Sequence, residues 1–500
     1  MKISLKIFAL LALLVSLASC SEDFLETTPT SSYDQSFVFT TTDNAFAALN
    51  GMHKSMVAQY DSRQNLGGYP SFQIAMDCLG EDLVFPSAGN GWWTNTGEVK
   101  WTANRNPNGW MVYFPYKLCY KLISNANMIL DNIDAAEGPD AQKNMIKGQA
   151  LAYRGMAYSW LVQLYGDRYN AGSANDALAV PLVINTVEVM KPQETVANIY
   201  AQIITDLEQS ITYLADPDNS YISFTSKSHI VASTVMGLRA RVALTMQDWA
   251  NAKKYAEMAI NTTSATLMSQ TQYTQGFNSA DNPEWMWGFE MIPDQTMYFY
   301  GYMAYMSWNF NSSNIRGCPK CINSLLYNKI SDTDIRKTLW DPTGKAFTMP
   351  SSSYKKYPYM NKKFAVEDYS SSVADANYMR LGEMYLIAAE ACANLNDATG
   401  AANHLYTLVS TRDKSYTKTV ATGATLLEEI YVQRRIELWG EGFRFLDLKR
   451  LNLPLDRTGA NHNESVSLTM KVPAGDILWK YAIPQDEIDA NDYIESTVND

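Results

Sequence analysis

The chain has 500 residues, 46% apolar and 18% charged, which is enough to bury a large core and excludes a disordered protein or a small disulfide-stapled scaffold. Its 40 Lys and Arg residues against 52 Asp and Glu residues give a net charge of -12, which excludes the basic surface typical of nucleic-acid-binding proteins. Aromatic residues make up 12% of the chain, more than an aliphatic core requires, and we expect some of these rings to face a ligand.

The first residues predict a signal peptide of the lipoprotein type. Lys2 and Lys6 precede an uncharged stretch of 15 residues, 7–21. This stretch is shorter than the roughly 20 residues of a membrane-spanning helix. Small residues in the sequence Leu-Ala-Ser-Cys at 17–20 suit a peptidase that cuts before Cys20. We therefore expect residues 1–19 to be removed and Cys20 to carry the lipid that anchors the mature chain to a membrane.

Beyond Cys20 the chain has five cysteines, an odd number, so at least one thiol stays unpaired. Cys318 and Cys321 have the CxxC spacing, but no second pair follows at zinc-finger distance, and the nearest histidines lie more than 80 positions away. The pair is expected to be a disulfide staple within a loop or two free thiols. The sequence predicts no metal centre and no cofactor.

Apolar residues recur at helical spacing over much of the mature chain, which predicts a mainly α protein built from helical hairpins. The expected helices cover about 118–130, 141–165, 196–214, 230–246, 249–260, 378–395, 399–409 and 426–438.

Two of these hairpins resemble each other at an offset of 149 residues. Residues 240–252 and 389–401 both place an aspartate at the turn, Asp248 and Asp397, and an alanine four positions later. The repeat favours tetratricopeptide-like packing, in which each hairpin buries its face against its neighbours and several hairpins form one scaffold. Any alanine-rich helical hairpin would give a similar pattern.

Two long excursions from the helical frame, about 62–110 and 266–377, are rich in Gly, Asn, Ser, Pro and aromatic residues. Ten aromatic residues lie within the 26 positions 285–310, where the average composition gives about three. Aromatic faces beside amide side chains can hold a sugar, which has flat C–H faces and a rim of hydroxyls. The candidate ligand-binding residues are Trp92, Trp93, Asn95, Trp285, Trp287, Tyr298, Tyr300 and Trp308.

These aromatic residues have a structural alternative, because a compact aromatic core or short strands would give the same composition. Adjacent residues in an extended loop point in opposite directions, so we expect one indole of the pair Trp92 and Trp93 to pack inward and the other to face outward.

Enzymatic motifs are missing from the sequence. It has no GxSxG, HExxH or GxGxxG motif and no complete phosphate-binding loop, and four scattered histidines offer little general-base capacity. The remaining alternative is a pair of carboxylates such as Glu81 and Asp82, acting as in a helical glycoside hydrolase.

Several motifs resemble the SusD/RagB family of bacterial outer-membrane lipoproteins, and the resemblance covers nearly all of the mature chain. The motifs are Cys-Ser-Glu-Asp-Phe-Leu-Glu-Thr-Thr-Pro at 20–29 with residues 44–51, Arg-Gly-Met-Ala-Tyr at 154–158 with Gln-Leu-Tyr-Gly-Asp at 163–167, residues 378–391, Arg-Arg-Ile-Glu-Leu-Trp-Gly-Glu-Gly-Phe-Arg-Phe-Leu-Asp-Leu-Lys-Arg at 434–450, and 483–491. One departure is that Asn491 is not followed by the proline common in the family.

The resemblance implies a non-catalytic, cell-surface protein that captures oligosaccharides for a TonB-dependent, SusC-like outer-membrane transporter. Relatives that resemble oligopeptide receptors make peptide capture the alternative. The resemblance also implies one compact fold with an N-terminal region 20–225 and a C-terminal region 226–500. In the motif at 434–450 we expect Glu437, Glu441, Arg444 and Asp447 to maintain the fold, with opposite charges meeting at a spacing of three, as in Glu441 with Arg444 and Asp447 with Arg450.

Overall fold

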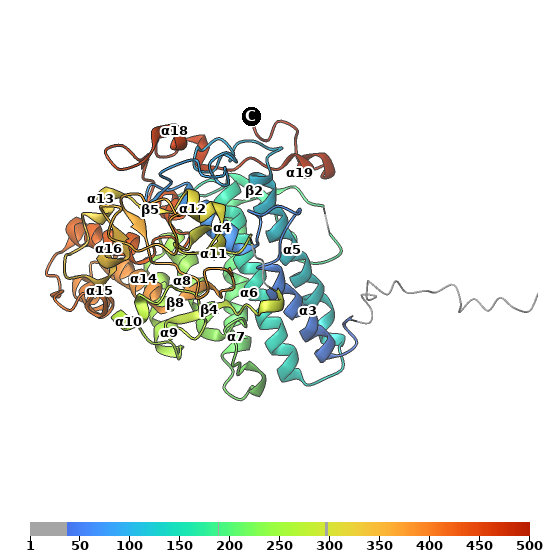
Figure 1. Ribbon diagram of the computed structural model, residues 1–500. Coiled ribbons are helices and arrows are strands. Elements are labelled where there is room, and N and C mark those ends of the chain that lie inside the picture. The colour runs from blue at the N-terminus through green and yellow to red at the C-terminus, as the bar shows by residue number, and fades with distance from the viewer. Residues whose placement is uncertain (1–37, 189, 296–298) are drawn as a thin grey trace, which may run out of the picture.

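The computed structural model describes residues 38–188, 190–295 and 299–500, and this part of the chain is mainly helical, as expected (Figure 1). Its helices are α3 (Thr42–Ser55), α4 (Tyr69–Cys78), α5 (Trp110–Asn132), α6 (Asp140–Tyr165), α7 (Val196–Leu214), α8 (Ala232–Thr245), α9 (Trp249–Thr262), α10 (Gln270–Tyr273), α11 (Met303–Met306), α12 (Ser313–Gly317), α13 (Ser324–Tyr327), α14 (Leu381–Asn394), α15 (Ala398–Arg412), α16 (Gly423–Glu437), α17 (Arg444–Arg450), α18 (Glu464–Ser467) and α19 (Gln485–Ala490). The predicted signal peptide and Cys20 lie outside the described residues. Within them, no helix has the length and apolarity needed to cross a bilayer.

The strands are short and lie mostly in the two excursions. They are β1 (Leu83–Val84), β2 (Leu178–Pro181), β3 (Gln193–Thr195), β4 (Trp285–Phe289), β5 (Cys321–Ile322), β6 (Trp340–Asp341), β7 (Met360–Asn361), β8 (Ala376–Arg380), β9 (Leu455–Asp456) and β10 (Lys471–Val472). One sheet has the order β1-β5-β7-β6 and so joins the two excursions, while β4 with β8, β2 with β3 and β9 with β10 form two-stranded sheets.

The two hairpins that resemble each other in sequence share their turn geometry, which confirms the repeat. Asp248 accepts a hydrogen bond from the backbone N–H of Asn251 at the start of α9, and Asp397 accepts one from Gly400 at the start of α15. The residue before each aspartate has a positive φ, 60° at Gln247 and 61° at Asn396. Hairpins α8–α9 and α14–α15 are thus two copies of one unit, and in Figure 1 α14, α15 and α16 lie on the opposite side of the molecule from α3, α5 and α6.

One predicted helix begins later than expected. The sequence predicts a helix from residue 378, whereas residues 376–380 form β8, which pairs antiparallel with β4 in the register Trp285↔Arg380 and Phe289↔Ala376. The paired residues lie 87 to 95 positions earlier in the chain, so the local apolar pattern could not reveal this strand. The short-strand alternative for the aromatic residues of the second excursion is confirmed for 285–289.

The turn between α16 and α17 contains the glycine-rich part of the motif at 434–450. Gly442 has φ 87°, and a Cβ at this position would lie 2.6 Å from the Gln73 Cα in α4, so this close approach requires glycine. The Gly442 N–H donates to the Asp77 carboxyl at 2.8 Å, and Asp77 is buried. The motif therefore fastens the C-terminal hairpins to α4 of the N-terminal region.

Replacing Asp77 with asparagine should flatten the dependence of stability on pH. Burial raises the pKa of Asp77 to about 8, far above its value of about 3.9 in an unfolded chain. Between these two values the folded chain holds a proton that the unfolded chain has lost, so rising pH favours unfolding. In the parent this proton should make the free energy of unfolding fall by up to about 1.4 kcal/mol per pH unit between pH 5 and 8. In Asp77→Asn this part of the fall should be absent.

Urea unfolding at several pH values measures this slope, with Asp492→Asn as the control at an exposed aspartate. Equal slopes for Asp77→Asn and the parent would show that Asp77 is ionised in the folded protein.

Candidate functional site

Three of the predicted ligand-binding tryptophans are core residues, which corrects the prediction for them. Trp93, Trp285 and Trp287 are 1%, 1% and 0% exposed. The Trp93 ring packs edge-on against Tyr305 with ring centroids 5.5 Å apart, and the Trp287 ring packs edge-on against Tyr378 at 4.9 Å. Both faces of β4 are covered, so alternation along the strand exposes neither of its indoles. These three rings cannot offer a face to a ligand from solution.

Trp92 and Asn95 lie at the surface of the first excursion. Trp92 is partly buried and Asn95 is exposed, so the two neighbouring indoles diverge, with Trp93 inward, as expected. The backbone N–H of Asn95 donates to the Gly91 carbonyl at 2.7 Å, which closes a tight turn around Trp92. The turn places the partly buried Trp92 in the same short loop as two exposed amide residues, Asn90 and Asn95.

The first excursion packs against α12 in the second. Asn90 Nδ2 donates to Ser313 Oγ at 3.2 Å, and Ser87 Oγ donates to the Gly317 carbonyl at 3.0 Å. Gly89 has φ 58°, and a Cβ there would lie 2.8 Å from the Cys318 Cβ, so only glycine allows this contact. The surface around Trp92 is therefore built jointly by segments more than 200 residues apart.

Cys318, at the end of α12, and Cys321 are both buried free thiols in the structure. Of the two alternatives for the CxxC pair, a disulfide staple or two free thiols, the second holds. Cys318 Sγ donates to the Ser87 carbonyl at 3.0 Å and so supports the junction of the two excursions.

The remaining predicted aromatic residues lie at different depths. Trp308 is partly buried, and Lys362 Nζ lies 4.5 Å from the centre of its ring, so one indole face is occupied by a cation–π contact. Tyr300 is partly buried and its carbonyl group packs against Gly67. Tyr298 lies outside the described residues.

The structure adds polar and aromatic neighbours that the sequence did not single out. Arg316 Nη1 donates to Asn311 Oδ1 at 2.9 Å, and the backbone N–H of Asn311 donates to the carbonyl of Tyr369, whose ring is 53% exposed. The sequence prediction was based on the aromatic residues at 285–310, so it included none of these three residues. We call the exposed and partly buried residues Asn90, Trp92, Asn95, Trp308, Asn311, Arg316 and Tyr369 of the two excursions the loop face.

The carboxylates considered as a catalytic pair are held by arginines. Asp82 pairs with Arg435 at 2.5 Å, and Arg444 Nε donates to Glu81 at 3.0 Å. Burial opposes ionisation of Glu81, but the Arg444 and Arg435 guanidiniums hold its pKa below the ordinary value. A glycoside hydrolase needs a carboxyl whose pKa is raised so that it can donate a proton, and Glu81 has the opposite environment.

The charged residues of the motif at 434–450 belong to buried ion-pair networks, which confirms their predicted role in the fold. Glu437 accepts from Arg336, Arg380 and Arg412, and all four side chains are at most 1% exposed. Asp447 pairs with Arg450 at 2.8 Å and with Arg434 at 2.8 Å.

One predicted pair in this motif is wrong. Glu441 pairs with Arg380 and Lys363, each at 2.7 Å, whereas Arg444 pairs with Glu81. Gly442 and Phe443 break the helix between Glu441 and Arg444, since α16 ends at Glu437 and α17 begins at Arg444, so a spacing of three does not bring the two side chains together.

Comparison with known proteins identifies relatives over nearly the whole chain. The family model of the SusD family matches residues 294–499, and a second model, described as starch-binding associating with outer membrane, matches residues 23–244. A SusD-like carbohydrate binding protein from Bacteroides vulgatus is 29% identical, with a TM-score of 0.80 over 91% of this chain and 98% of that chain.

Two other relatives are less similar in sequence. A SusD superfamily protein from Bacteroides thetaiotaomicron is 23% identical, with a TM-score of 0.75 over 91% of this chain and 99% of that chain. A SusD-like protein from Formosa agariphila is 22% identical over 387 residues, which cover 68% of this chain and 70% of that protein.

Proposed function

Because this chain belongs to the SusD/RagB family, we propose that it is a cell-surface lipoprotein that captures oligosaccharides and delivers them to a TonB-dependent, SusC-like outer-membrane transporter. The observation that carries the proposal is the loop face, where the partly buried Trp92 shares one short loop with the exposed Asn90 and Asn95. The indole can stack on a sugar ring while the amides donate to and accept from its hydroxyls. The relative from Bacteroides vulgatus, described as carbohydrate binding, supports the same ligand class.

The loop face can extend beyond one sugar unit. Ser313 lies between Asn311 and Arg316 in the chain and accepts a hydrogen bond from Asn90. Asn311 and Arg316, which are hydrogen-bonded to each other, therefore lie across the junction from Asn90. Tyr369 offers a second exposed ring. Trp308 is partly buried, and Trp308, Tyr300 and Tyr298 stay candidates for the margin of the site. We infer an oligosaccharide ligand that spans both excursions.

We propose binding without turnover. The arginine pairs of Glu81 and Asp82 support this, as does the absence of the catalytic motifs from the sequence. A glycan array, followed by calorimetry with the glycans that bind, tests the function. We expect heat of binding with oligosaccharides and no cleaved product after prolonged incubation. Heat only with oligopeptides would identify a peptide receptor, and cleaved glycan would identify an enzyme.

Substituting the proposed lipid attachment site should release the protein from the membrane. We expect Cys20→Ser to abolish acylation, because serine lacks the thiol that receives the lipid. Mass spectrometry of the mature N-terminus should find an acylated Cys20 in the parent. Cell fractionation should find the variant outside the outer-membrane fraction. Ser21→Ala is the control and should keep the lipid. A parent protein that begins with a free Ser21 or with Met1 would refute the anchor.

The transporter partner is tested by extraction of the parent protein from its own membrane in mild detergents. We expect a large outer-membrane barrel protein to co-purify with it. Recovery of the chain alone in several detergents would contradict the partnership while leaving glycan binding intact.

A further inference from the structure

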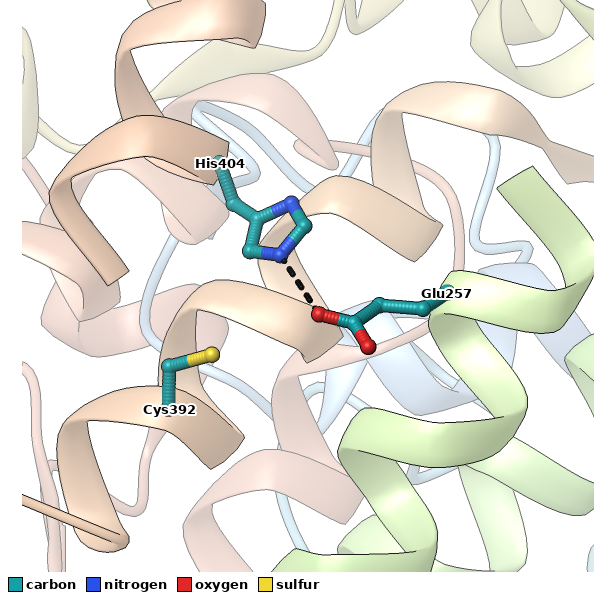
Figure 2. Close-up of side chains that lie close together, drawn as sticks. All are labelled: Glu257, Cys392 and His404. Carbon is teal, nitrogen blue, oxygen red and sulfur yellow. Dashed lines mark hydrogen bonds and ion pairs between the residues drawn. The ribbon is translucent and has the colours of Figure 1, made fainter. Parts of the chain in front are cut away.

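Three helices of the C-terminal hairpins bring a carboxylate, a thiol and an imidazole together (Figure 2). Glu257 lies on α9, Cys392 on α14 and His404 on α15. Their ligand atoms all lie within 4.8 Å of one another, and His404 Nε2 lies 3.1 Å from a Glu257 carboxylate oxygen. No sequence motif indicates this cluster, because Glu257 and Cys392 are 135 positions apart and Cys392 and His404 are 12 positions apart.

The three groups converge on one point instead of forming a catalytic relay. In a nucleophilic triad the imidazole lies between the thiol and the acid and uses one ring nitrogen for each. Here Figure 2 shows the Cys392 sulfur and the Glu257 carboxylate on the side of the imidazole that carries Nε2. Burial also raises the pKa of Cys392 to about 11, so the thiol holds its proton at neutral pH and is a poor nucleophile.

We propose that Glu257, Cys392 and His404 form a binding site for a divalent transition-metal ion of the zinc type. Tetrahedral zinc with sulfur, nitrogen and oxygen ligands separates its ligand atoms by about 3.3–3.6 Å, given bond lengths of about 2.0–2.3 Å. The 3.1 Å between His404 and Glu257 is close to this edge, and Cys392 Sγ, within 4.8 Å of both other ligand atoms, would move closer to reach the ion. Thiolate and imidazole ligands favour zinc over calcium or magnesium.

The surroundings allow a metal ion to enter and to be held. The Glu257 and His404 side chains are 35% and 20% exposed, while Cys392 is fully buried beneath them. Lys253, whose charge acts on the thiol, is paired with Asp397 at 3.0 Å, and this pair offsets its charge. Three protein ligands leave a fourth position for water. The ion would replace the thiol proton and join α9 to hairpin α14–α15, so it would stabilise the stack.

The experiment uses the full mature chain after treatment with a chelator and a thiol reductant. Zinc chloride at about 100-fold above the dissociation constant should raise Tm by about 2–5 °C. Cobalt(II) chloride should give the near-ultraviolet charge-transfer band of a cobalt–thiolate bond. Cys392→Ala and His404→Gln should each weaken cobalt binding at least about 100-fold and abolish the zinc-dependent rise.

The control removes the other closely spaced thiols in the double variant Cys318→Ala, Cys321→Ala, which should keep both the band and the rise. Glu257→Gln and His404→Gln change partly exposed side chains and should fold even if Cys392→Ala does not. A parent protein without the cobalt–thiolate band, or a band that disappears only in the Cys318 and Cys321 double variant, would overturn the proposal.

Discussion

Replacing Glu437 with glutamine is expected to lower the free energy of unfolding by about 3–5 kcal/mol, because it removes a counter-ion that three buried arginines share. Arg380 and Arg412 donate to one oxygen of the Glu437 carboxylate at 2.6 and 2.9 Å, and Arg336 donates to the other at 2.9 Å. Glu284, Glu441 and Asp334 also pair with these arginines, but Glu437 is the carboxylate that contacts all three. The guanidiniums hold the pKa of Glu437 well below its ordinary value against the opposing effect of burial.

The matched control is Glu428→Gln, on the same helix α16, whose carboxylate pairs with Lys329 at the surface and is 62% exposed. An exposed pair contributes at most about 1 kcal/mol, so this variant should unfold close to the parent. Urea unfolding followed by circular dichroism compares the three proteins. Equal losses in both variants would show that the motif at 434–450 has no special role in the fold.

The two adjacent tryptophans of the first excursion should respond oppositely to truncation. Trp92→Ala should weaken glycan binding about tenfold or more, because it removes the face on which a sugar ring stacks, and it should change Tm little. Trp93→Ala should lower the free energy of unfolding by about 3–5 kcal/mol, because it empties a core position that is 1% exposed and packs against Tyr305.

Calorimetry with an array-selected glycan and thermal unfolding of both variants measure these effects. Trp92→Phe, which keeps an aromatic face, should recover part of the lost affinity. If Trp92→Ala binds as the parent does, or loses as much stability as Trp93→Ala, the site lies elsewhere and both indoles are packing residues.

The helical frame could be predicted from the sequence because helix periodicity is local. The predicted helix at 196–214 coincides with α7, and the capping aspartates of the two related hairpins are visible in the sequence. Strand β8 was missed because its partner β4 is distant in the chain. Glu441 and Arg444 were wrongly paired because a turn at Gly442 separates two helices that the spacing rule joins.

The site could be predicted only in part, since composition locates aromatic residues without showing their burial. The sequence indicated that one of Trp92 and Trp93 faces inward but not which one. It counted Trp285 and Trp287 toward the ligand-binding residues, although both lie on a strand whose two faces are covered. Hydrogen bonds link Asn311 to Arg316 and Tyr369, and Ser313 of the same segment accepts from Asn90 of the first excursion; no local sequence pattern records these contacts.

The most direct test of the central claim is a crystal structure of the mature chain with an array-selected oligosaccharide. We expect an intact glycan on the loop face, with a sugar ring stacked on Trp92 and hydroxyls within hydrogen-bond distance of Asn90 or Asn95. A glycan bound only at another surface, or one cleaved in the crystal, would contradict the account.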